Sequence, residues 1–201
     1  EQTEAVGHSV RAGYMYSAMA DVAALTGDRD YLGASDTLWD NVVGKKMYVT
    51  GGIGSRHHRE EFGDDYELPN ETAYCETCAA ISSVMWNHRM FLLHGEAKYL
   101  DVLERVLYNG FLAGVSFSGK EFFYPNPLAS DGTWDFNKGA NVRQPWFGCS
   151  CCPTNVVRFL PSLPGYAYAV KDAAVYINLF MGSEATVNVN GQSVRLVQET
   201  N

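Results

Sequence analysis

Two short turns of similar composition recur far apart in the chain, and each leads into a Tyr-Leu pair. The first covers residues 26–32 and reads Thr-Gly-Asp-Arg-Asp-Tyr-Leu, and the second covers residues 94–100 and reads His-Gly-Glu-Ala-Lys-Tyr-Leu. A glycine is the usual residue just past the end of a helix. Each turn therefore predicts a pair of helices, and repeated helix pairs are typical of a toroid or solenoid of helices.

Apolar and small residues recur at intervals of three and four along four segments, which predicts four helices. The expected helices cover residues 5–25, 31–43, 71–94 and 96–112. Asn70 is the expected N-cap of the third helix. The segment 48–69 is rich in glycine, histidine and acidic residues, and long loops of this kind are usually functional. Four helices cannot close a barrel of helix pairs, so we expect the chain to be part of a longer protein.

Beyond residue 114 the pattern changes to short β-like runs, such as residues 122–124, and to turn-rich segments. Residues 151–168 are expected to hold a short helix, which Pro161 and Pro164 interrupt because proline ends or kinks a helix.

The C-terminal segment reads as strands. Asn190-Gly191 lies between the last two runs and is a strong hairpin signal. The expected strands cover residues 174–180, 185–189 and 193–197. The fold class that we predict is mainly α, with a helical domain at 1–170 and the first strands of a β-sandwich at 171–201.

Composition excludes some classes of partner. The chain has 201 residues, of which 46% are hydrophobic, and a net charge of −8, as expected of a globular protein with a substantial core. The acidic balance and the lack of a basic run argue against binding to nucleic acid. No apolar stretch reaches the roughly 20 residues that span a bilayer, so we expect no membrane partner.

All five cysteines fall in two clusters, at residues 75–78 and 149–152. Neighbouring cysteines bond each other poorly, because a disulfide needs separated Cα atoms and Cβ vectors turned together. The pair Cys151 and Cys152 therefore suggests a metal site. The alternative is a group of buried structural thiols, since free cysteine is among the most buried residue types.

Glu76 and Cys78, together with Cys151 and Cys152, would form a Cys₃Glu set suited to a tetrahedral Zn²⁺. Glu76 and Cys78 are two residues apart and diverge on a regular helix, so they converge only at a helix start or where the backbone is distorted. The two other cysteines, Cys75 and Cys149, are expected to be core thiols.

Glu60 and Glu61 follow a glycine-rich run beside aromatic residues. Partial burial of such a carboxyl group raises its pKa and makes it a candidate general acid. The alternative is a solvated, charged loop. His57 and His58 are metal ligands or, more commonly, loop residues that form hydrogen bonds, and the glycine run lacks the Lys-Ser/Thr of a phosphate-binding loop.

Four motifs together resemble the β-L-arabinofuranosidases of glycoside hydrolase family 127, to which family 146 is related. They are Thr50-Gly51-Gly52-Ile53-Gly54-Ser55-Arg56-His57-His58, Tyr66-Glu67-Leu68-Pro69-Asn70, Tyr74-Cys75-Glu76-Thr77-Cys78-Ala79 and Cys151-Cys152-Pro153-Thr154-Asn155. The resemblance covers nearly the whole chain in order. It implies part of an (α/α)₆ barrel of helical hairpins, followed by the start of a β-sandwich.

The resemblance also implies a set of roles. Zinc would be bound by Glu76, Cys78, Cys151 and Cys152. Cys151 would be the nucleophile and Glu60 the general acid/base of a retaining glycoside hydrolase, and His8 and Tyr124 would contact the sugar. The implied partner is a carbohydrate substrate, from which the enzyme would release β-L-arabinofuranose or a related pentofuranose. Cys75 departs from the small residue, such as alanine, that we expect at its position.

Two other functions stay open from the residues alone. One is a structural zinc site in a non-catalytic carbohydrate-binding or scaffold module. The other is a thiol redox role for Cys149, Cys151 and Cys152, although no thioredoxin-like βαβ pattern supports it. A zinc–thiolate site needs reduced cysteines, which favours a cytoplasmic location. A homodimer is left open.

Overall fold

Residues 2–200 are described by a computed structural model, in which the chain divides into two units between Val156 and Val157. The first unit is mainly helical and the second carries the strands. The predicted domain boundary at 170/171 differs from this division and stays a prediction about domains.

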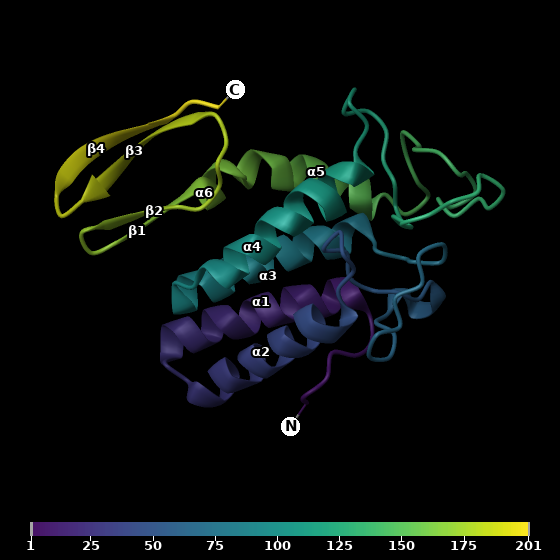
Figure 1. The fold of residues 1–201 in the computed structure, drawn as a ribbon, viewed down its shortest axis with the longest axis horizontal. Helices are drawn as coiled ribbons and strands as arrows, with labels where there is room; N and C mark the ends of the chain where they lie inside the picture. The colour runs from purple at the N-terminus through teal and green to yellow at the C-terminus, as the bar shows by residue number, and fades with distance from the viewer. Residues whose placement is uncertain (1, 201) are drawn as a thin grey trace. The chain divides into compact units, whose positions relative to one another are not determined.

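Two helical hairpins form the centre of the first unit (Figure 1). Their helices are α1 (Ser9–Thr26), α2 (Arg29–Asn41), α3 (Thr77–His94) and α4 (Ala97–Arg105). Gly27 and Gly95 follow α1 and α3 with φ of 70° and 71°, and each donates its N–H back to the preceding helix. This left-handed conformation is one that glycine adopts without steric cost. The helix pairs predicted from the two similar turns are therefore confirmed.

The second helix of each hairpin ends in a π-helical turn. Val42–Lys46 follows α2, and Val106–Phe111 follows α4 and leads into a 3₁₀ turn at Leu112–Gly114. The predicted end at residue 43 therefore lies inside the first π-helical turn, and the predicted end at residue 112 lies just after the second, at the start of the 3₁₀ turn. Single π-turns within helices often lie near functional sites.

Helices α1 and α3 lie side by side at short range (Figure 1). The rings of Tyr16 and Trp86 meet there with their centroids 4.9 Å apart. Gly13 faces α3 so closely that a Cβ atom added to it would lie 2.2 Å from the hydroxyl oxygen of Ser82. The absence of a side chain at Gly13 is thus a condition of this packing.

Replacement of Gly13 by alanine is expected to lower the midpoint of thermal unfolding. The added methyl group must displace Ser82 or separate the two helices, and overpacking of this kind costs about 1–3 kcal/mol. Gly33→Ala in α2 is the matched control, because a Cβ there meets nothing within 4 Å and alanine is the better helix former. Equal midpoints for the two variants would contradict the close contact.

Helix α3 begins later than predicted, and Asn70 is not its N-cap. Glu76 occupies the N-cap position, with φ −59° and ψ 139°, and Cys75 before it has φ of 40°. The segment that precedes α3 pairs with the long loop instead of continuing the helix. Its backbone N–H groups at Tyr74 and Cys75 donate to the carbonyls of Ser55 and Gly54, at 3.2 and 2.8 Å.

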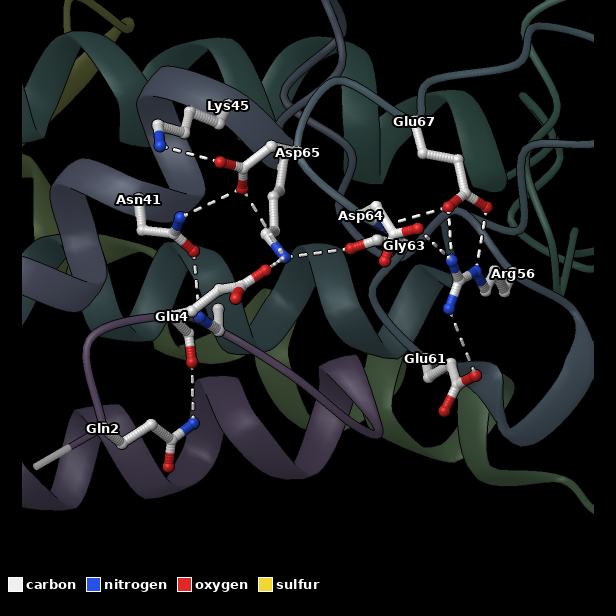
Figure 2. A network of polar contacts seen from close by, with 12 residues as sticks. Gln2, Glu4, Asn41, Lys45, Arg56, Glu61, Gly63, Asp64, Asp65 and Glu67 are labelled. Carbon is white, nitrogen blue, oxygen red and sulfur yellow. Dashed lines mark hydrogen bonds and ion pairs between the residues drawn. The ribbon is translucent and has the colours of Figure 1, made fainter.

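The long loop between α2 and α3 is held by ion pairs. Arg56 donates two hydrogen bonds, of 2.8 and 2.5 Å, to the Glu67 carboxylate (Figure 2). The hydrogen bond from Arg56 keeps the pKa of Glu67 below its usual range. The buried Lys46 ammonium donates to Glu4 (2.6 Å) and to the carbonyl of Gly63 (2.9 Å). The first contact therefore joins two parts of the loop, and Lys46 ties the loop to the turn that follows α2.

Helix α5 (Cys151–Phe159) begins at the cysteine pair, and a 3₁₀ turn at Leu160–Ser162 and the short helix α6 (Pro164–Ala167) follow. The interruptions lie where Pro161 and Pro164 predict them. None of the helices in residues 2–200 has the length and apolar character needed to cross a membrane.

The second unit contains two antiparallel hairpins, and each forms its own two-stranded sheet. Their strands are β1 (Tyr168–Lys171) with β2 (Ala174–Ile177), and β3 (Ser183–Val189) with β4 (Gln192–Gln198). Asn190 and Gly191 join β3 to β4 with φ of 51° and 80°, as in the tight turn that the sequence predicts. β1 was not predicted, because it is short and follows a helix directly.

Candidate active site and metal centre

The structure brings Glu76, Cys78, Cys151 and Cys152 together. One ligand atom of each residue lies within 4.8 Å of those of the other three. Glu76 and Cys78 stand at the start of α3, and Cys151 and Cys152 open α5. Because the backbone of Glu76 is extended rather than helical, its side chain can turn toward that of Cys78 despite the spacing of two residues. Two clusters that are 74 residues apart in sequence thus form one site.

The separations within this cluster fit a tetrahedral ion. Cys78 Sγ lies 3.6 Å from Cys152 Sγ, which lies 3.8 Å from Cys151 Sγ. Glu76 Oε1 lies 3.5 Å from the sulfur atoms of both Cys151 and Cys152. Metal–sulfur bonds of about 2.3 Å in a tetrahedron imply separations between ligands of roughly 3.5–3.8 Å. The four side chains are therefore spaced to hold one ion.

The second carboxylate oxygen of Glu76, Oε2, is buried and has no hydrogen-bond partner within residues 2–200. Burial raises the pKa of the Glu76 carboxyl to about 9, and the neighbouring Cys151 adds to the rise. A buried acid of this kind is costly to ionise unless a cation lies beside it. The donor set of three sulfurs and one carboxylate oxygen matches what Zn²⁺ prefers.

Cys151 is the member of the cluster that carries negative charge most readily. Hydrogen bonds from Cys152 and Cys78 hold the pKa of the Cys151 thiol well below its usual range, whereas burial raises the pKa of Cys152. Cys151 is half-buried, while the other three residues are buried. The reactive form of a cysteine is the thiolate, so Cys151 is the candidate nucleophile of the cluster.

The hydroxyl of Tyr124 lies 3.0 Å from Cys151 Sγ, and when Cys151 is a thiolate this hydroxyl donates to it. Tyr124 follows Phe122, which forms isolated bridges with Val115 and Gln144. The β-like run predicted at residues 122–124 therefore supplies bridges and not a strand. The bridges of Phe122 hold the segment that places Tyr124 beside Cys151.

Glu60 lies in the long loop, in an unusual backbone conformation. Arg59 and Glu60 have φ of 57° and 55°, a left-handed region that is rare for residues other than glycine and that tends to occur at functional sites. Glu60 Oε1 accepts a hydrogen bond of 2.7 Å from the Tyr74 hydroxyl, and Oε2 lies 3.1 Å from His8 Nε2. The Ser9 hydroxyl donates to the Glu60 carbonyl at 3.2 Å. The carboxyl group is thus held at both oxygens.

Glu60 and His8 line a cleft of about 660 Å³, whose other walls include Arg11, His57 and Arg59. A carboxyl group at the edge of an open, polar cleft can exchange a proton with a bound molecule. Glu60 and His8 therefore lie together, as expected of neighbouring site residues.

Tyr74 and Lys138 were given no role from the sequence, yet they lie between Glu60 and Tyr124. Lys138 Nζ lies 2.9 Å from the Tyr74 hydroxyl and 4.3 Å from the centre of the Tyr124 ring. Tyr74 belongs to the motif around Glu76, which could have drawn attention to it. Lys138 comes from a turn-rich stretch without any pattern, so nothing in the sequence marks it.

Of the two remaining cysteines, one agrees with the prediction of a core thiol and the other does not. Cys75 is buried, as predicted for a core thiol, and burial raises the pKa of its thiol. Cys149 is exposed, so the prediction that it is a core thiol is wrong. It precedes α5 in an irregular segment, and no helical face places it inside. His57 packs edge-on against the Tyr74 ring at 4.7 Å and lies outside the metal cluster.

Comparisons with known proteins identify the family of this chain. The family described as "Beta-L-arabinofuranosidase, GH127 catalytic domain" matches residues 1–165. The non-reducing end β-L-arabinofuranosidase of Bifidobacterium longum subsp. longum is 42% identical over 176 residues, which are 86% of this chain and 27% of that protein.

Solved structures are similar as well. A GH127 β-arabinofuranosidase shares 61% identity with a TM-score of 0.93, over 99% of this chain and 30% of that one. A GH127 β-L-arabinofuranosidase from Geobacillus stearothermophilus T6 shares 46% identity with a TM-score of 0.94, over 100% of this chain and 32% of that one. The chain thus spans about a third or less of the length of these relatives, and it belongs to glycoside hydrolase family 127.

Proposed function

We propose that the protein containing this chain is a retaining glycoside hydrolase that releases β-L-arabinofuranose from the non-reducing end of a glycan or glycoconjugate. Cys151 is its nucleophile and Glu60 its general acid/base. The observation that carries the proposal is the series of contacts that links the two groups. Tyr124 lies 3.0 Å from Cys151 Sγ, and Lys138 joins the Tyr124 ring to Tyr74, which donates to Glu60. The sugar is suggested by the relatives, which are named as β-L-arabinofuranosidases.

The first step of the reaction forms a bond between Cys151 Sγ and the anomeric carbon, while the bond to the leaving oxygen breaks. Glu60 gives its proton to that oxygen. In the second step water attacks the same carbon, the carbon–sulfur bond breaks, and Glu60 takes the proton from the water. Two inversions leave the configuration unchanged, as in retaining enzymes that use a carboxylate nucleophile.

Tyr124 and His8 are proposed to contact the sugar. The Tyr124 hydroxyl stands beside the sulfur that would attack, and His8 stands beside the oxygen of Glu60 that faces the cleft. Both side chains can form hydrogen bonds to sugar hydroxyl groups while the reacting atoms are aligned.

We propose that Zn²⁺ is the ion held by Glu76, Cys78, Cys151 and Cys152. Bound zinc supplies positive charge that keeps the coordinating thiols deprotonated at neutral pH. The spacing of the four ligand atoms and the unpartnered carboxylate oxygen of Glu76 support a resident ion.

Removal of the metal from the full-length protein is expected to abolish turnover of p-nitrophenyl β-L-arabinofuranoside and to lower the thermal midpoint. The reason is that two thiols and a carboxyl group would be left buried without a cation. Zinc content, measured by atomic spectroscopy before and after chelation, should fall from one ion per chain as activity is lost, and both should return on adding zinc. Full turnover by metal-free protein would contradict the assignment, and Cys149→Ser should keep its zinc.

A further inference from the structure

Lys138 lies in a sharp turn whose backbone is held in place by hydrogen bonds of the neighbouring Asn137 side chain. Lys138 and Gly139 have φ of 55° and 98°, so the chain reverses sharply there. The fully buried side chain of Asn137 anchors this turn. It accepts the backbone N–H of Tyr124 at 2.8 Å and donates to the carbonyl of Val142 at 2.7 Å. The turn that carries Lys138 is thus tied to the segment that carries Tyr124.

The ammonium group of Lys138 reaches both halves of the proposed catalytic site. It lies 4.3 Å from the centre of the Tyr124 ring, a distance typical of a cation–π contact. It donates to the Tyr74 hydroxyl at 2.9 Å and lies 3.6 Å from Glu60 Oε1. Tyr124 in turn contacts Cys151 at 3.0 Å. Lys138 therefore connects the surroundings of the acid/base with those of the nucleophile.

The direction of the hydrogen bonds follows from the chemistry of the donors. A lysine ammonium group can only donate, so the Tyr74 oxygen must accept from Lys138. The single proton of the Tyr74 hydroxyl is then free to be donated to Glu60 Oε1, at 2.7 Å. Oε1 accepts from Tyr74 and lies 3.6 Å from the Lys138 ammonium, so a proton carried by Glu60 belongs on Oε2, where His8 Nε2 accepts it when the imidazole carries its own proton on Nδ1.

We infer that Lys138 is a positioning residue, which acts through Tyr74 to keep the acidic proton of Glu60 on the oxygen beside His8 and the cleft. The inference rests on the proposed function, in which Glu60 protonates the leaving group. Without Lys138, the Tyr74 hydroxyl can rotate and accept instead of donate. The proton of Glu60 can then settle on Oε1, which faces Tyr74 and Lys138 rather than His8.

The test compares two substrates with the full-length protein: methyl β-L-arabinofuranoside, whose leaving group needs a proton, and p-nitrophenyl β-L-arabinofuranoside, whose leaving group does not. For Lys138→Met, kcat/KM is expected to fall about ten-fold or more on the methyl glycoside and less than about three-fold on the aryl glycoside, because only general acid catalysis is weakened. Lys138→Arg, which also only donates, should recover most of the loss. The double variant Lys138→Met/Tyr74→Phe should lose no more than Tyr74→Phe alone.

Lys120→Met is the matched control, since Lys120 is exposed on another segment and should change neither substrate. Equal losses on both substrates for Lys138→Met, or no loss on the methyl glycoside, would overturn the inference, as would losses that multiply in the double variant. Wild-type turnover of both glycosides is measured first. Its absence counts against the proposed function, whereas a flat response to Lys138→Met counts against the role of Lys138 alone.

Discussion

Replacement of Cys151 by serine is expected to reduce turnover of p-nitrophenyl β-L-arabinofuranoside by on the order of a thousand-fold or more, because losing a nucleophile removes the covalent route. A serine hydroxyl is a far weaker acid than a thiol and stays protonated beside Tyr124. The measurement is kcat/KM of the full-length variant, with zinc content determined on the same sample.

Cys149→Ser is the comparison for this experiment, because Cys149 is an exposed thiol outside the metal cluster, and its hydrogen bond lowers the pKa of Cys151 less than those of Cys152, Cys78 and Tyr124 do. It should retain most of the activity. A Cys151→Ser variant that keeps more than about a tenth of wild-type turnover would show that the sulfur does not attack the sugar, since loss of a nucleophile costs far more.

Replacement of Glu60 by glutamine is expected to separate the two steps of the reaction. On methyl β-L-arabinofuranoside, kcat/KM should fall by about 10²–10⁴, the usual contribution of general acid–base catalysis. On the aryl glycoside the first step should proceed without the acid, while the second lacks its base. A glycosylated protein should then accumulate, and mass spectrometry after quenching should find one pentosyl group on the peptide that contains Cys151.

Glu61→Gln is the matched control for Glu60→Gln, because the neighbouring carboxylate lies 3.8 Å from Arg56 and was not assigned to the reaction. Identical behaviour of the two variants would remove Glu60 from the mechanism. An adduct on any residue other than Cys151 would keep the acid/base but change the nucleophile.

The parts of the fold that depend on local patterns could be predicted from the sequence. Gly27 and Gly95 end helices in a conformation that glycine favours, and Asn190-Gly191 forms its turn for a similar reason. The start of α3 could not be predicted, because Tyr74 and Cys75 donate their backbone N–H groups to the distant loop rather than to a helix. Tertiary pairing there overrides the local signal of Asn70.

The residues of the candidate site also divide into those that the sequence reveals and those that only tertiary contacts reveal. The four proposed metal ligands stand in two cysteine-rich clusters, which their residue types reveal. Lys138 acts through contacts with Tyr74 and Tyr124 that join distant segments, so only the folded chain discloses it. Cys149 was placed in the core because free cysteine usually lies there, but its segment is irregular and its side chain is exposed.

The metal cluster also sets an order for assembly during synthesis. Cys78 leaves the ribosome 74 residues before Cys152, its partner at 3.6 Å. Closing a loop of that length costs roughly 4 kcal/mol of chain entropy. The proposed ion can be bound by both clusters only after α5 has been synthesised. Until then Cys78 stands near the start of the nascent helix α3, with Cys75 as the one other thiol already synthesised. On the proposed assignment, metal binding is therefore a late event that joins two distant parts of the chain.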